Sequence, residues 1–147
     1  MSYINIMVHV VWATKNREPL LIDDKRDTLF RHIRENARSK EIYIDTIGGH
    51  IEHVHCLISL GAEQSIAKVV QLIKGESAFW SNKERLINPK LEWAAYYFAA
   101  SVSYSSVRKV RDYINRQTEH HREVSFAEEY EKFLIACGVD SDKARME

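Results

Sequence analysis

The order of strand-like and helix-like segments constrains the fold of this chain more than any other feature of its sequence. Apolar side chains recur at every second position in residues 3–13, which predicts a β-strand with one face formed by Ile4, Ile6, Val8, Val10 and Trp12. A helix is expected from Asp23 or Asp24 onward, because either side chain can cap it and apolar residues then recur at helical spacing as Leu29, Phe30, Ile33 and Ala37. Residues 41–47 and 53–60 are again strand-like. Gly48-Gly49 between them is expected to supply turn conformations, which predicts a hairpin.

The second half of the chain continues the pattern. Ser65 can cap an amphipathic helix that Asn88-Pro89 must end, and residues 93–103 have the composition of a fourth strand. The resulting order, β-α-β-β-α-β, predicts the α+β class and a ferredoxin-like fold, in which an antiparallel four-stranded sheet carries the two helices on one face. The other face then needs a cover, from a later helix or from a second subunit.

Two more helices are expected after the sheet. The first begins at Ser105 or Ser106 and places Val107, Val110 and Ile114 on one apolar stripe. The second begins at Ser125, since Glu128 three residues later completes a capping box, and ends at Gly138. No repeat, low-complexity tract or Pro/Gly-rich linker interrupts the 147 residues, so we expect one domain over 1–147 with an acidic helix and tail at 123–147.

Charge is distributed unevenly although the formal net charge is zero. Residues 1–122 carry 18 Lys and Arg against 14 Asp and Glu, whereas residues 123–147 carry 3 against 7. A mildly basic body, with a net charge of +4, is therefore masked by an acidic end, and that body could meet phosphates. No apolar run is long enough for a membrane span and no secretory signal is recognisable, so a cytoplasmic protein without membrane contact is expected. Two cysteines far apart exclude a CxxC zinc knuckle.

The most informative chemical feature is the pair His53 and His55. Two positions apart on a predicted strand, both imidazoles must point to the same face, opposite Val54 and Cys56. A strand that holds two imidazoles at a fixed separation suits a metal ion. An unliganded pair on a half-exposed strand is the alternative.

A further ligand should come from elsewhere in the chain, and the helix after Ser106 offers candidates. Tyr113 and Gln117 are one helical turn apart and share a flank beside the stripe of Val110 and Ile114. A phenol and an amide there could present a nucleophile and an oxygen ligand to one place. The alternative is that Tyr113 is a boundary core aromatic and Gln117 a solvated side chain.

These residues resemble the single-tyrosine transposases of the HUH class, small enzymes that move bacterial insertion sequences as single-stranded DNA, together with their domesticated relatives. The resemblance covers roughly residues 3–138. It rests on the opening stretch His9 to Arg17, the His53-Val54-His55 motif after Gly48-Gly49, Lys74 to Ser77, Trp93, Tyr97, Ser101 to Ser103, Tyr113 to Gln117, His120-His121 and the Ser125 to Tyr130 segment. Glu52 stands where the family often has Asp, and its strand parity keeps it from the histidines unless the turn at His50 and Ile51 bends it inward.

The resemblance implies a role for each of these residues. His53, His55 and Gln117 are expected to hold Mg²⁺ or Mn²⁺, and Tyr113 to attack the scissile phosphate and form a 5′-phosphotyrosine link with a free 3′-hydroxyl. Members of the family act as homodimers on single-stranded DNA with hairpin ends, and the tyrosine helix of one subunit can complete the histidine site of the other.

Phosphate contacts are predicted from the basic residues that lie near these motifs: Lys15, Arg17, Lys74, Arg108, Lys109 and Arg116. The leading hypothesis is thus a metal-dependent transposase that cleaves and rejoins single-stranded DNA. A domesticated DNA-hairpin binder without cleavage activity is the second hypothesis. A hydrolase of small phosphoesters is the third, and it requires a deep pocket.

Overall fold

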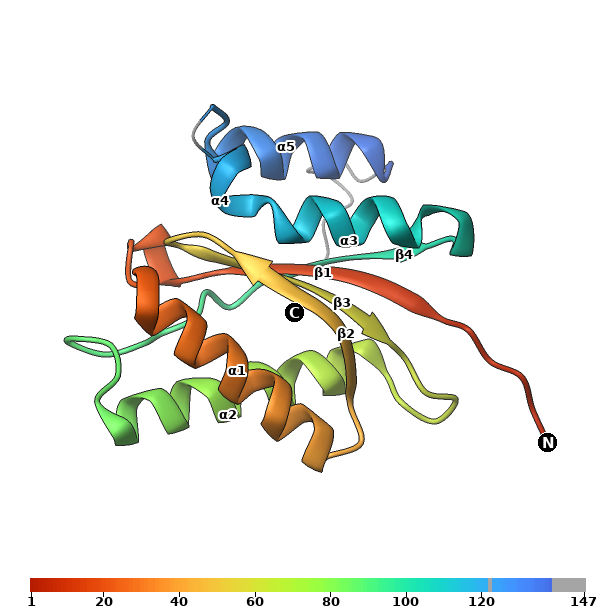
Figure 1. Ribbon diagram of the computed structural model, residues 1–147, viewed down its shortest axis with the longest axis horizontal. Helices are drawn as coiled ribbons and strands as arrows, with labels where there is room; N and C mark the ends of the chain where they lie inside the picture. Colours follow the sequence, from red (N-terminus) through yellow and green to blue (C-terminus); the bar gives the residue numbers. More distant parts are fainter. Residues whose placement is uncertain (122, 139–147) are drawn as a thin grey trace.

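The computed structural model describes residues 1–121 and 123–138 and confirms the predicted α+β class (Figure 1). Four antiparallel strands form one sheet in the order β2-β3-β1-β4. Their bounds are Met7–Ala13 for β1, Tyr43–Gly49 for β2, His53–Ser59 for β3 and Phe98–Val102 for β4. The central strands β1 and β3 pair so that Val11 lies opposite His55, which puts the histidine motif in the middle of the sheet.

One face of the sheet packs against α1, Asp23–Ser39, and α2, Ile66–Glu84 (Figure 1). The alternation predicted for β1 and β3 places their apolar side chains against the apolar stripes of these two helices. The resulting core includes Val8, Val10, Trp12, Val54, Cys56, Ile58, Leu29, Phe30, Ile33, Ala37, Val69, Val70 and Ile73. The Ser65 hydroxyl caps α2 as expected, because it accepts a hydrogen bond from the Lys68 amide at 3.1 Å.

The second face is covered by the chain's own C-terminal helices (Figure 1). Helix α3, Val107–Asn115, is followed by the short α4, Gln117–His120, and by α5, Phe126–Ala136. Val107 and Ile114 of α3 pack on Met7 and Leu57. Phe126 of α5 packs with Val11, Ala13 and Phe98 of the neighbouring strands. The face that the sequence left open is therefore buried without a second subunit.

The termini of several elements differ from the sequence-based prediction. β1 begins at Met7 and not at Tyr3, since its partner strands β3 and β4 end at Ser59 and Val102, opposite Met7. β4 is confined to Phe98–Val102. At the start of the predicted strand, Trp93 forms an isolated bridge with Thr14. The acidic segment forms α5 as far as Ala136, while residues 139–147 of the predicted acidic tail lie outside the described residues.

Gly48-Gly49 is not the hairpin turn. Both glycines belong to β2 and pair with His55 and Val54, so the turn falls at residues 50–52. Neither glycine has a positive φ, and what requires them is close packing: a Cβ on Gly48 would lie 2.4 Å from the Ile114 carbonyl oxygen of α3. Within the described residues, no helix combines the length and apolar character needed to cross a membrane.

Candidate active site

The two motif histidines lie side by side on β3, on the face covered by α3 and α5. His53 and His55 have 0% exposed surface, so neither belongs to the exposed unliganded pair that was the alternative. Their rings are 5.1 Å apart between centroids and inclined at 75°. Strand geometry thus brings two imidazoles into one buried polar chamber.

Each histidine is oriented by a polar partner on the side away from its neighbour. Glu52 lies in the turn before β3, where its Oε1 accepts a hydrogen bond from His53 Nδ1 at 2.7 Å. His55 Nδ1 lies 2.9 Å from His9 Nε2 on β1. Burial lowers the pKa of His9 to about 4 and that of His55 to about 3, and both imidazoles are therefore neutral at pH 7. The turn residue Glu52 reaches the site by bending inward, as its strand parity required.

Helix α3 brings Tyr113 to the histidines because Gly48 lets its backbone approach β2 closely. Gln117 follows, although not on the same continuous helix as predicted. Arg116 leaves the helical conformation, with φ −106° and ψ 20°, and the chain restarts as α4 at Gln117. This break turns the buried Gln117 side chain toward β3, where its Oε1 lies 2.9 Å from His53 Nε2.

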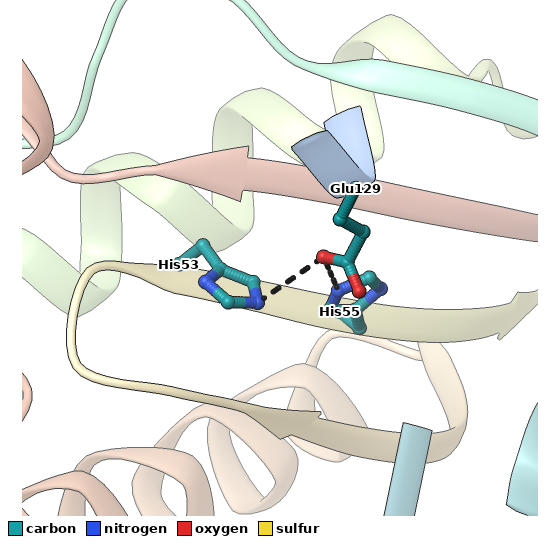
Figure 2. A group of neighbouring side chains, drawn as sticks. All are labelled: His53, His55 and Glu129. Atoms are coloured by element: carbon teal, nitrogen blue, oxygen red, sulfur yellow. Dashed lines mark hydrogen bonds and ion pairs between the residues drawn. The ribbon is translucent and has the colours of Figure 1, made fainter. Parts of the chain in front are cut away.

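A carboxylate that the sequence analysis did not identify completes the chamber. Glu129 projects from α5 between the two histidines (Figure 2) and is 2% exposed. Its Oε1 lies 3.1 Å from His55 Nε2, 3.5 Å from His53 Nε2 and 3.2 Å from His121 Nε2. Burial opposes its ionisation, but hydrogen bonds from His121 and His55 hold the pKa of Glu129 below its ordinary value. The carboxylate is therefore ionised at neutral pH.

The Tyr113 hydroxyl donates a hydrogen bond to the second oxygen of this carboxylate, Glu129 Oε2. His120 Nε2 lies 3.1 Å from the same oxygen and 3.4 Å from the tyrosine hydroxyl. Burial, together with the Glu129 carboxylate, raises the pKa of Tyr113 above its ordinary value, so the phenol is neutral at rest. Tyr113, Arg116, Glu119, His120 and Glu123 line an open hollow of about 260 Å³.

Imidazole nitrogens, an amide oxygen and a carboxylate oxygen are all donors suited to a divalent metal ion. The ligand atoms of His53, His55 and Glu129 all lie within 4.8 Å of one another, and the donor set therefore fits such an ion. Outer partners such as Glu52 and His9 are also typical of metal-binding histidines.

The predicted phosphate-binding residues do not share one location, and of them only Arg116 lines the hollow beside Tyr113. Arg108, Lys109 and Arg116 are exposed on and directly after α3. Lys15 and Arg17 are exposed in the short 3₁₀ helix Lys15–Arg17, where Lys15 pairs with Glu92 at 3.3 Å and the Arg17 guanidinium lies 5.2 Å from the Phe126 ring centroid. Lys74 already has backbone partners, since its Nζ donates to the Ala94 carbonyl at 2.6 Å, and burial lowers its pKa.

A comparison with known families matches residues 2–117 to the model described as "Transposase IS200 like". The chain belongs to the IS200-like transposase family. Its similarity extends to a curated relative, the ISDra2 transposase TnpA of Deinococcus radiodurans, which is 28% identical over 121 residues that cover 78% of this chain and 84% of the relative.

Solved structures share the fold of this IS200-like transposase. One is a transposase from Deinococcus radiodurans, with a TM-score of 0.62, 23% identity and coverage of 80% of this chain and 95% of that one. Another is a REP-associated tyrosine transposase bound to a REP hairpin, with a TM-score of 0.63, 16% identity and coverage of 100% of this chain and 90% of that one. The second likeness includes α5, which lies beyond the residues matched by the family model.

Three residues of the transposase site escaped the sequence analysis: Glu129, His121 and His9. The capping box places Glu129 only in an acidic helix, and His121 and His9 enter only through the segments that carry the family resemblance, without a role in the site. The alternation of side chains on β1 could have indicated the position of His9. His9 is two residues from Val11 and points to the same face of the sheet, away from the core formed with α1 and α2. No comparable local signal exists for Glu129, which is 74 residues from His55.

Proposed function

We propose that this IS200-like transposase cleaves and rejoins single-stranded DNA beside hairpins, with Tyr113 as the nucleophile. One observation carries the proposal: the Tyr113 hydroxyl lies at the histidine chamber of its own chain, hydrogen-bonded to the carboxylate that contacts His55. The family membership and the REP-hairpin complex of a structural relative support the choice of substrate. The shallow hollow beside Tyr113 offers little enclosure for a small phosphoester.

The proposed reaction is a transesterification. The Tyr113 oxygen attacks the phosphorus, the new phosphorus–oxygen bond forms to tyrosine, and the bond to the 3′ oxygen breaks, which releases a 3′-hydroxyl. Mg²⁺ or Mn²⁺ held by His53, His55 and Gln117 would supply a Lewis acid that polarises the phosphate and stabilises the leaving oxygen. The reverse attack by a 3′-hydroxyl rejoins strands without an external energy source.

The phenol must lose its proton during the attack, because its pKa is raised at rest. Glu129 Oε2 is the acceptor that the hydroxyl already contacts, and His120 Nε2, 3.1 Å from that oxygen and 3.4 Å from the hydroxyl, stabilises the carboxylate from the open side. Glu129 orients both groups through the same oxygen. Arg116, at the rim of the hollow, can contact the phosphate of the bound strand.

The tyrosine meets the histidines of its own chain in this structure, which supports catalysis within one subunit. A homodimer stays a prediction from the family resemblance, and light scattering on the purified protein measures it directly. His53→Ala and Tyr113→Phe should each be inactive alone. If Tyr113 acts across the subunits of a dimer, a mixture of the two variants should regain activity. Catalysis within one subunit predicts no recovery.

The decisive experiment is covalent trapping. Purified protein is incubated with Mn²⁺ or Mg²⁺ and labelled single-stranded hairpin DNA from the ends that flank its own gene, and denaturing gels are searched for a protein–DNA species. We expect the species in the wild type, its loss with EDTA, and its loss in Tyr113→Phe with hairpin binding within about threefold of wild type.

Two other outcomes would contradict the proposal. Hairpin binding by the wild type without any covalent species would favour the domesticated DNA-binding protein. A covalent species that persists in Tyr113→Phe would assign the nucleophile to another residue.

A further inference from the structure

Five ligand-type atoms lie in one chamber, two more than the predicted metal site contains. Glu129 Oε1 lies 3.1 to 3.5 Å from the Nε2 atoms of His55, His121 and His53. Gln117 Oε1 lies 2.9 Å from His53 Nε2 and 3.1 Å from His121 Nε2. Three segments of the chain supply these atoms, namely β3, the α4 region and α5.

Each of the two oxygens faces more than one imidazole nitrogen. Gln117 Oε1 lies between the Nε2 atoms of His53 and His121, and Glu129 Oε1 lies beside those of His55, His121 and His53. His53 Nδ1 points the other way, to Glu52 Oε1 at 2.7 Å. Buried nitrogen and oxygen atoms gathered in this way form a setting in which a cation is stable.

The separations also match those of a coordination shell. Neighbouring ligand atoms of an octahedral ion with bonds of about 2.1 Å are about 3 Å apart. The contacts of Gln117 and Glu129 with the histidines span 2.9 to 3.5 Å. On the outer side, Glu52 and His9 hold the Nδ1 atoms of His53 and His55, as outer partners of metal-bound imidazoles commonly do.

We propose that His121 and Glu129 bind the same metal ion as His53, His55 and Gln117, so that the ion fastens α5 to the sheet. The inference rests on the proposed function, because it extends the metal site assigned there. Three imidazoles with one carboxylate favour a transition-metal ion over Mg²⁺. The Tyr113 hydroxyl keeps its hydrogen bond to Glu129 Oε2, so the same carboxylate contacts the metal site through Oε1 and the nucleophile through Oε2.

Metal titration of the purified full chain tests the ligand set. Co²⁺ is added to the apoprotein and followed by visible absorption, and Mn²⁺ and Mg²⁺ binding is measured by calorimetry. We expect one ion per wild-type chain, Mg²⁺ bound at least tenfold more weakly than Mn²⁺, and affinity for Co²⁺ reduced at least tenfold in Glu129→Gln and in His121→Asn. Glu128→Gln is the matched control, since Glu128 is exposed at the start of α5, and it should bind within about twofold of wild type.

The outcomes separate this inference from the proposed function. Wild-type affinity in Glu129→Gln or His121→Asn removes that residue from the ligand set, and if His53→Asn has then lost the ion, the three-ligand site still stands. A wild-type chain that binds none of Co²⁺, Mn²⁺ and Mg²⁺ overturns both, whereas one that binds Mg²⁺ alone overturns only this inference.

A second measurement uses only the wild-type chain and does not depend on how the variants fold. Amide hydrogen exchange is measured in two samples, one that contains EDTA and one that contains Mn²⁺ at about a hundred times its dissociation constant, and the two are compared. A ligand on α5 predicts exchange in residues 126–136 slowed at least tenfold more than in α1, because opening of α5 then requires loss of the ion. Equal effects on α5 and α1 would show that α5 holds no ligand.

Discussion

At the residue scale, Gly48 determines how closely the tyrosine helix approaches the sheet. Gly48 pairs with His55 in the β-ladder, and the Ile114 carbonyl of α3 packs directly over it. Ile114 follows Tyr113, so the same contact fixes the height of the nucleophile above the histidine motif. A residue without functional groups thereby positions the chemistry.

Replacing Gly48 with alanine should lower stability by about 1 to 3 kcal/mol, because the new Cβ would lie 2.4 Å from a backbone oxygen that cannot rotate away. Gly75→Ala is the matched control. Nothing lies within 4 Å of a Cβ at this position of α2, and the substitution should stabilise the protein by about 0.5 to 1 kcal/mol through helix propensity. Urea unfolding measures both, and equal stability of Gly48→Ala and wild type would mean that α3 can retreat without cost.

At the scale of elements, α5 is the part of the fold that closes the site. Phe126 stacks on the His53 ring, with centroids 4.2 Å apart and planes inclined by 7°. Phe133 lies against His9 and Phe98. The helix is therefore attached by aromatic contacts on both sides of Glu129 in the chain.

Truncating Phe126 to alanine should weaken this attachment by about 3 kcal/mol, which corresponds to roughly a hundredfold rise in local opening. Hydrogen exchange in the metal-free protein should accelerate in residues 126–136 and stay unchanged in β1 and β3. Ile135→Ala, at a side chain that is 72% exposed on the same helix, should have no such effect. Unchanged α5 exchange in Phe126→Ala would show that the aromatic stacking does not hold the helix.

At the scale of the whole molecule, buried neutral histidines make stability depend on pH. The pKa values of His9 and His55 fall to about 4 and about 3 on folding, whereas an unfolded histidine titrates near 6.5. Below pH 6.5 these two histidines therefore bind protons in the unfolded chain but not in the folded chain. The free energy of unfolding decreases as the pH falls. The pKa of His121 is raised through its bond to Glu129, against the effect of burial, so this residue opposes the trend.

Unfolding free energy of the metal-free protein should therefore decrease between pH 6.5 and pH 4, by at most about 1.4 kcal/mol per pH unit for each of the two imidazoles. Urea titrations at several pH values measure the slope. His9→Asn should reduce this slope, because it removes one of the two imidazoles that bind a proton only in the unfolded chain. A slope that His9→Asn leaves unchanged would assign the acid sensitivity to other groups.

The proposed binding of DNA by the mildly basic body predicts a salt dependence, which also belongs to this scale. Arg116→Gln should weaken hairpin binding and lower the slope of log affinity against log salt by about 1, since one phosphate contact is lost. Lys40→Gln also removes one positive charge, at the C-terminal end of α1. This helix lies on the side of the sheet away from α3 and α5 (Figure 1), so the slope should not change. Equal slopes for Arg116→Gln and wild type would remove Arg116 from the DNA interface.

The sequence by itself determined the features that depend on local periodicity. Alternation in β1 and β3 settled which side chains face α1 and α2, and hence that His53 and His55 share the opposite face. Helical spacing, capping residues and the family motifs identified α2, α5, Tyr113 and Gln117. These features need only residues that are near one another in the chain.

Only the tertiary structure decided how the C-terminal helices dock. The break at Arg116, the strand role of Gly48 and the inward orientation of Glu129 and His121 depend on contacts between segments more than 60 residues apart, such as Gln117 with His53 and Glu129 with His55. A buried carboxylate also contradicts the local pattern, which places charges toward water. Ionised Glu129 is stable in the chamber because His121 and His55 donate to it, and long-range packing brings His55 on β3 to α5.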